Sequence, residues 1–195
     1  MEKNKKEEKE KKEELVELFN KENCTFKRYS VNKYLLEYDM ENTNIYMTKI
    51  IDFSLIQLIY NLNPDIYEHI EFNKINDTHV VSILLMKHFF EDIGLPQRYS
   101  FMNIKKEVEQ NRILFKAETI IQKEKPQQIP NEAEVLNIDN LTCICDLITP
   151  HKVKISFDIN FNSGFHIPLF AEKMIGIIIH KIFKRLKQFI ENITI

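Results

Sequence analysis

The sequence predicts an α+β domain in which a curved antiparallel sheet wraps around a long C-terminal helix, with two short helices after the first strand. Residues 152–161 alternate without interruption between polar and apolar side chains, which is typical of a strand with one solvated and one buried face. After a break at Asn162-Ser163-Gly164, apolar residues recur every three or four positions from Ala171 to Ile193. This spacing predicts an amphipathic helix that closes the domain.

The residues before this closing unit predict short strands and two helices. Asp52 or Ser54 is placed to cap a helix over 53–62, and Pro64 suits the first turn of a second helix over 65–70. Asp139-Asn140 indicates a hairpin turn. We expect strands at residues 34–38, 45–51, 72–75, 80–89, 98–106, 113–121, 134–138 and 141–148. Because all the turns are short, the sheet is expected to be an antiparallel meander.

Composition divides the chain into three segments. Residues 1–22 are expected to be a charged N-terminal tail or helix, since the first 14 contain six Lys and six Glu and residues 15–19 fit a short amphipathic helix. Residues 23–43 are expected to be an N-terminal extension, and residues 44–195 the folded domain. A tail with this many charges cannot bury apolar surface. We expect it either to keep the protein in solution or to bind a protein partner.

Composition and motifs also argue against several classes of function. The net charge is −2 and no long basic run is present, so nucleic acid is not expected as a partner. The three glycines stand alone and the six histidines lack zinc-site spacing, so we expect no cofactor and no metal. Cys143 and Cys145 are expected to be buried free thiols. With no secretory signal and no uninterrupted apolar span, a cytoplasmic location is expected.

From about Ile45 to Ile193 the chain resembles the START-like superfamily, whose helix-grip fold is shared by START lipid-transfer domains and polyketide cyclase-like (SRPBCC) proteins. Residues 50–59 (IIDFSLIQLI) are similar to the first strand running into the first helix, 63–70 (NPDIYEHI) to the short second helix, and 161–169 (FNSGFHIPL) to the start of the last helix. The resemblance identifies no subfamily and carries over no catalytic residue. It implies a hydrophobic ligand in a cavity between sheet and helix, although a solid core would bury the same faces.

Strand alternation and the helical stripe select the residues that would line such a cavity. They are Val81, Ile83, Leu85, Phe89, Ile113, Phe115, Ala117, Cys143, Cys145, Ile155, Phe157, Ile159, Ala171, Met174, Ile175, Ile178 and Ile182. Lys87 shares the presumed inward face of its strand. It is expected either to meet a ligand head group or to reach solvent near the strand end.

Four cations, Lys181, Lys184, Arg185 and Lys187, cluster near the end of the last helix. They either complement the helix dipole or dock the protein on an anionic membrane surface. Three functions therefore remain open. The first is binding or transfer of a lipid or other hydrophobic small molecule. The second is a non-enzymatic protein-interaction or co-chaperone module of the same fold. The third is a cyclase-like or hydrolase-like pocket enzyme, which the lack of a recognisable acid–base pair disfavours.

Overall fold

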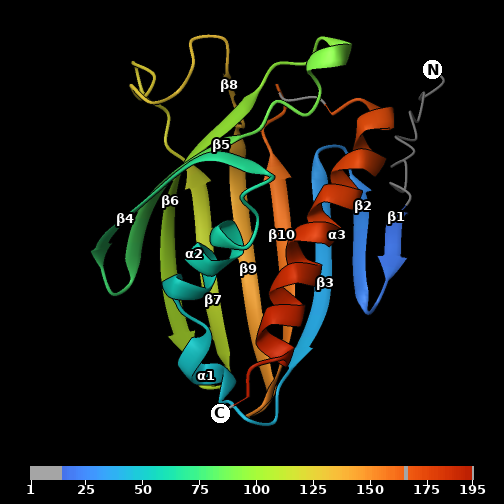
Figure 1. Cartoon of the computed structure of the whole chain (residues 1–195), viewed down its shortest axis with the longest axis vertical. Helices are drawn as coiled ribbons and strands as arrows, with labels where there is room; N and C mark the ends of the chain where they lie inside the picture. Colours follow the sequence, from blue (N-terminus) through green and yellow to red (C-terminus); the bar gives the residue numbers. More distant parts are fainter. Residues whose placement is uncertain (1–14, 165–166, 195) are drawn as a thin grey trace, which may run out of the picture.

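The computed structural model describes residues 15–164 and 167–194, in which a strongly curved sheet holds the helices on its concave face (Figure 1). The strand order is β1-β2-β3-β10-β9-β7-β6-β5-β4, with β8 beside β6. The elements are β1 (Val16–Lys21), β2 (Cys24–Ser30), β3 (Lys33–Glu41), α1 (Met47–Ile50), α2 (Phe53–Asn61), β4 (Tyr67–Asn76), β5 (His79–Met86), the 3-10 turn η1 (Glu91–Ile93), β6 (Arg98–Glu109), β7 (Arg112–Thr119), β8 (Glu134–Val135), β9 (Ile138–Thr149), β10 (Lys152–Phe161) and α3 (Leu169–Glu191).

The predicted α+β fold is confirmed, with the alternating strand β10 at the centre of the sheet and α3 across its concave face (Figure 1). β10 pairs antiparallel with β3 on one side and with β9 on the other. Val153 and Ile155 are buried beneath the helix layer. β2 and β3, from the expected N-terminal extension, belong to this same sheet. The expected boundary at residue 44 lies between β3 and α1.

Three polar side chains, exposed Asp52 and buried Asn63 and Asn42, fix the ends of the helices. The Asp52 carboxylate accepts the backbone N–H of Phe53 and caps α2. Asn63, fully buried, donates from Nδ2 to the carbonyl of Ile59 (2.7 Å) at the other end of α2. Asn42 donates from Nδ2 to the carbonyls of Ile190 (2.6 Å) and Ile193 (2.9 Å). It thereby satisfies acceptors that the last turn of a helix leaves open.

The convex face of β5 and β6 carries a second, smaller hydrophobic cluster. Its buried members are Ile83 and Leu85 from β5, together with Ile129 and Ala133 from the β7–β8 connection. The connection is held in shape by Lys125, whose ammonium group donates to three carbonyls of the same segment, those of Pro130 (3.1 Å), Asn131 (2.6 Å) and Ala133 (2.6 Å). β5 is therefore covered on both faces.

Four local predictions are wrong. Residues 45–51 contain the helical turn α1 (Met47–Ile50) and no strand, and Met47 N donates to Pro150 O (2.8 Å) in the β9–β10 turn without a ladder forming there. Residues 67–70 open strand β4 instead of ending a helix. Asp139-Asn140 lies inside β9 and makes no hairpin, while β8 pairs in parallel with β6. Residues 16–19 belong to strand β1, paired with β2, instead of a helix. Residues 1–14 lie outside the described part of the chain.

Candidate functional site

An apolar cavity of about 230 Å³, here called cavity 1, lies between the concave face of the sheet and helices α2 and α3. None of the described residues that line it is an Asp, Glu, His, Lys or Arg. Its wall is formed by Leu36, Tyr38, Leu55, Ile56, Ile59, Tyr60, Tyr67, Met102, Ile104, Phe115, Ala117, Leu141, Cys143, Cys145, Ile155, Phe157, Ile159, Ile179, Ile182 and Phe183.

Cross-strand rows of side chains form the sheet wall of cavity 1. One row joins Tyr38 in β3, Ile155 in β10 and Cys145 in β9, which lie opposite one another in the ladders. Because side chains alternate between faces, the next inward row lies two residues along each strand. That row consists of Leu36, Phe157, Cys143 and Phe115. The wall of cavity 1 is thus set by strand register.

A second apolar cavity of about 240 Å³, here called cavity 2, adjoins the first. Tyr67, Ile179 and Ile182 line both cavities and therefore lie at the boundary between them. Its other walls are the N-terminal half of α3 and the β5–β6 connection. The full lining is Ile66, Tyr67, Met86, Lys87, Phe89, Phe90, Pro96, Gln97, Arg98, Leu136, Phe161, Ile167, Ile175, Ile178, Ile179 and Ile182.

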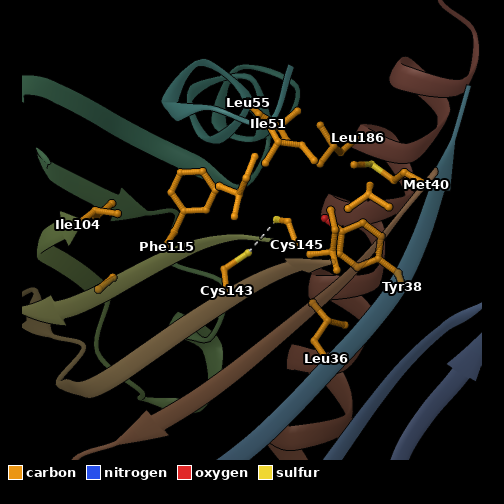
Figure 2. Packing of buried hydrophobic residues seen from close by; sticks show 14 of the residues in the cluster. Leu36, Tyr38, Met40, Ile51, Leu55, Ile104, Phe115, Cys143, Cys145 and Leu186 are labelled. Atoms are coloured by element: carbon orange, nitrogen blue, oxygen red, sulfur yellow. Dashed lines mark hydrogen bonds between the residues drawn. The ribbon is translucent and has the colours of Figure 1, made fainter. Parts of the chain in front are cut away.

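The polar atoms that cavity 1 does contain are hydroxyls and thiols. Figure 2 shows Tyr38 pointing from β3 toward Cys145, and Cys145 Sγ lies 3.8 Å from Cys143 Sγ. Burial raises the pKa of the Tyr38 hydroxyl well above its usual value, and the neighbouring thiols add to this shift. Burial also raises the pKa of Cys143. Tyr60 and Tyr67 meet edge to face with ring centroids 5.1 Å apart, and burial raises the pKa of both. These hydroxyls and the Cys143 thiol therefore stay neutral at physiological pH.

The C-terminal half of α3 is tethered to the turn between α2 and β4. Lys181 Nζ lies 2.6 Å from Asp65 Oδ2, and Arg185 pairs with the same carboxylate. Arg185 also donates to Asn63 Oδ1 (3.0 Å). Hydrogen bonds from Arg185 and then Lys181 hold the pKa of Asp65 far below its usual value.

The other two cations of the predicted docking cluster are also paired. Lys184 Nζ lies 2.6 Å from Glu22 Oε1 in the β1–β2 turn, and Lys187 lies 3.6 Å from Glu191 one helical turn later. His180 stands 3.9 Å from the same Glu22. The cluster therefore links α3 to two neighbouring turns in this conformation.

The predicted lining residues fall into three groups. Cavity 1 is lined by Phe115, Ala117, Cys143, Cys145, Ile155, Phe157, Ile159 and Ile182. Cavity 2 is lined by Phe89, Ile175, Ile178 and Ile182. The remaining six line neither cavity: Val81, Ile83, Leu85, Ile113, Ala171 and Met174. Met174 is 46% exposed on the outer side of α3.

Residues of β3 and α2 also line cavity 1, although they were not among the predicted lining residues. Leu36 and Tyr38 line cavity 1 from β3, and Leu55, Ile56 and Ile59 line it from α2. The buried residues at 34, 36, 38 and 40 are all apolar or aromatic, and this alternation can be read from the sequence. The sequence pattern does not indicate that this strand pairs with β10, which is a long-range contact.

Two further features of the described chain bear on its chemistry. Within residues 15–164 and 167–194, no group of three or more His, Cys, Asp or Glu side chains is arranged to hold a metal ion. None of the helices seen there has the length and apolar character needed to cross a membrane.

Solved structures of lipid-transfer domains have the same fold as this chain. The human StarD13 (DLC2) lipid transfer and protein localization domain is 7% identical with a TM-score of 0.67, over 93% of this chain and 91% of that one. Human StAR-related lipid transfer protein 5 is 14% identical with a TM-score of 0.60, over 90% and 87%. A STAR-related lipid transfer protein from Xanthomonas axonopodis is 12% identical with a TM-score of 0.59, over 90% and 98%. No protein-family model and no curated protein sequence matches the chain. The chain therefore has the START-like helix-grip fold, and identities this low establish the fold alone.

Proposed function

We propose that this protein binds and transfers a lipid or another hydrophobic small molecule between the sheet and α3. The observation that carries the proposal is the pair of adjoining apolar cavities of about 230 and 240 Å³ with three lining residues in common. Ligand pockets typically enclose ~300–1,000 Å³ and have mostly apolar walls with few polar groups. The two cavities reach that range only together, so the ligand is expected to occupy both.

The fold neighbours support this proposal by analogy. Three solved structures of this fold are described as lipid-transfer domains or proteins. Fold alone does not determine function, and the chemistry must come from the site. Here the site agrees with the analogy, because the described wall of cavity 1 is apolar apart from hydroxyl and thiol groups.

Ligand release requires a path out of the cavities. Cavity 2 is lined by the β5–β6 connection through Phe89, Phe90 and Pro96, and by the N-terminal half of α3. Phe89 is 40% exposed, so this end of the cavity lies near the surface. We propose that the connection and the helix move apart to admit and release ligand.

We also propose that Lys181, Lys184, Arg185 and Lys187 contact an anionic membrane during delivery. Lys181 and Arg185 hold α3 to Asp65, and Lys184 holds it to Glu22. Lipid phosphates would compete with those carboxylates for the same cations, at roughly 1 kcal/mol per basic residue near the surface. Such competition would weaken the tethers of α3 at the membrane, where release is needed.

Ligand binding is tested with a cavity-filling variant. Ala117→Phe places a ring into cavity 1, whereas Glu118→Phe adds the same ring to the exposed face of the same strand. We expect Ala117→Phe to weaken binding of the hydrocarbon fluorophore diphenylhexatriene strongly and Glu118→Phe to leave it unchanged. Native mass spectrometry with organic extraction identifies any lipid carried through purification. A folded Ala117→Phe protein that binds the fluorophore like the wild type would show that the ligand does not occupy cavity 1.

Membrane contact is tested separately by sedimentation with anionic vesicles. The double variant Lys184→Glu, Arg185→Glu should weaken vesicle binding at least about tenfold. The matched control, Lys105→Glu with Lys116→Glu, reverses two exposed lysines on β6 and β7. Equal vesicle binding by both variants would remove the α3 cations from the proposal.

A further inference from the structure

Tyr38 is a tyrosine of the cavity 1 wall whose hydroxyl makes no hydrogen bond to another described residue. Tyr38 is only 3% exposed and lines cavity 1. The other tyrosines of the same two strands differ from it. Tyr34 donates to Glu172 Oε1 (2.8 Å), and Tyr29 donates to Asp158 Oδ1 (2.7 Å). A hydroxyl that lies in apolar surroundings without a partner costs free energy. Tyr60 and Tyr67 line cavity 1 in the same way, but Tyr38 is the one held on an interior strand of the sheet.

The surroundings of Tyr38 are suited to a neutral oxygen atom. Its ring is fixed between Phe183, at 4.9 Å between centroids, and Phe157, at 6.4 Å. Its hydroxyl end points toward Cys145 (Figure 2), and a thiol is only a weak hydrogen-bond donor and acceptor. A rigid hydroxyl in an apolar wall is the kind of polar group that orients a ligand in such pockets.

The same wall disfavours an ionised group. None of the described residues lining cavity 1 carries a positive charge that could pair with a carboxylate or phosphate, whereas Lys87 and Arg98 line cavity 2, so an anionic group is disfavoured in cavity 1 alone. Transferring an unpaired anion from water into such surroundings is far more costly than transferring a hydroxyl. The thiols of Cys143 and Cys145 carry no positive charge either, so they offer no counter-charge.

We propose that cavity 1 binds an uncharged lipid whose hydroxyl or carbonyl oxygen hydrogen-bonds to Tyr38 while its hydrocarbon part contacts the remaining wall. This inference rests on the proposed function and names the class of ligand for that same site. It distinguishes neutral oxygen-bearing lipids, such as long-chain alcohols, from ionised fatty acids and from plain hydrocarbons.

The test measures displacement of diphenylhexatriene by decane, 1-decanol and decanoate from the wild type, from Tyr38→Phe and from the control Tyr46→Phe. Tyr46 is 53% exposed and lines neither cavity. We expect Tyr38→Phe to weaken 1-decanol binding ~3- to 10-fold, the range of one net hydrogen bond, without weakening decane binding. Tyr46→Phe should change neither. At about pH 8, where a carboxylic acid is ionised, decanoate should bind the wild type more weakly than 1-decanol.

The outcomes separate this inference from the proposed function. If the wild type binds neither diphenylhexatriene nor decane, the proposed function fails and the inference fails with it. If both bind but Tyr38→Phe weakens 1-decanol and decane equally, or weakens neither, the inference alone is overturned. The comparison of decanoate with 1-decanol uses the wild type alone, so it does not depend on how well Tyr38→Phe folds. Decanoate binding as tightly as 1-decanol would overturn the inference by itself.

Discussion

Cavity 1 and cavity 2 have nearly equal volumes, about 230 and 240 Å³, but their walls are built differently. Five neighbouring strands, β3, β10, β9, β7 and β6, contribute to cavity 1, and continuous backbone ladders fix their positions. Cavity 2 is closed partly by residues 87–97, which connect β5 to β6 through the 3-10 turn η1. This connection has no continuous ladder. It is held by isolated turn bonds, such as Leu95 N to Phe90 O (3.1 Å), and by single bonds to its neighbours, such as Lys87 N to Ile66 O (2.9 Å).

This difference suggests a division of labour between the cavities. None of residues 87–97 is buried, and segments with few buried contacts open at lower free-energy cost than the ladders of a sheet. We therefore expect the sheet-walled cavity 1 to determine which ligand binds and how tightly. The loop-walled cavity 2 should determine how fast the ligand enters and leaves.

The largest expected effect comes from Ile182, one of the three residues that line both cavities. Ile182 is 8% exposed, so Ile182→Asp would bury an unpaired carboxylate against both cavities and cost several kcal/mol of unfolding free energy. Ligand binding should be lost with it. The control Ile177→Asp lies on the same helix at a position 67% exposed and should stay within ~0.5 kcal/mol of the wild type. Equal thermal stability of the two variants would show that α3 does not pack where the structure places it.

The next effect separates the two cavities kinetically. Phe90 is half-buried and lines cavity 2 only. Phe90→Ala should speed the uptake and release of diphenylhexatriene several-fold with little change in affinity, because it thins the moving wall and leaves the ladders intact. Stopped-flow fluorescence measures both rates. A loss of affinity as large as that of Ala117→Phe, with unchanged rates, would contradict the division between the cavities.

A smaller effect is expected from the ion pairs that tether α3 to the turn between α2 and β4. Hydrogen bonds from Arg185 and Lys181 keep the pKa of Asp65 well below its usual value. A carboxyl with a depressed folded-state pKa stabilises the fold above its unfolded pKa of ~3.9, and this contribution is lost as the pH falls toward the folded value. The side chain of Asp65 is 41% exposed, so solvent screening limits the loss in Asp65→Asn to ~0.5–1 kcal/mol at neutral pH.

Urea unfolding at neutral pH and near pH 3 measures this contribution. The wild type should lose stability between these values, and Asp65→Asn should lose less of it. The control Asp77→Asn removes a carboxylate that pairs with Lys74 in the exposed β4–β5 hairpin. This hairpin ends the sheet on the β4 edge, and α3 is not one of the partners of Asp77. If the two variants are equally stable at neutral pH, the Asp65 tether does not hold α3.

The parts of this fold that the sequence predicted are those with one solvated face. β10 and α3 each expose one side, so polar and apolar residues recur with the period of a strand or a helix. The cap of α2 at Asp52 was likewise a local signal. β5 had no such signal, because the β7–β8 connection covers its convex face. Residues 80–85 are therefore almost all apolar, and the inward face was assigned to Ile83 and Leu85 in place of Val80 and Leu84.

The candidate site was predictable only where its walls came from elements already placed. Phe115, Cys143 and Phe157 follow from alternation along β7, β9 and β10. Tyr38 does not, because its role depends on β3 lying beside β10, more than 110 residues later in the chain. Nor does periodicity separate a hollow core from a filled one, since both bury the same faces.

The smallest expected effect tests whether charge contributes at the mouth of cavity 2. Lys87 lines this cavity, is exposed, and forms no ion pair with the described residues. If exchange is governed by packing of the β5–β6 connection and the ligand is uncharged, Lys87→Gln should leave the exchange rates of 1-decanol unchanged at any salt concentration. Phe90→Ala, measured alongside, should still speed them. Decanoate, measured in the same way, supplies the charged comparison. A rate change in Lys87→Gln that is seen with decanoate, is absent with 1-decanol and disappears in high salt would be the signature of electrostatic steering. It would mean that the mouth of cavity 2 favours negatively charged ligands, so that the two cavities differ in charge selectivity as well as in mobility.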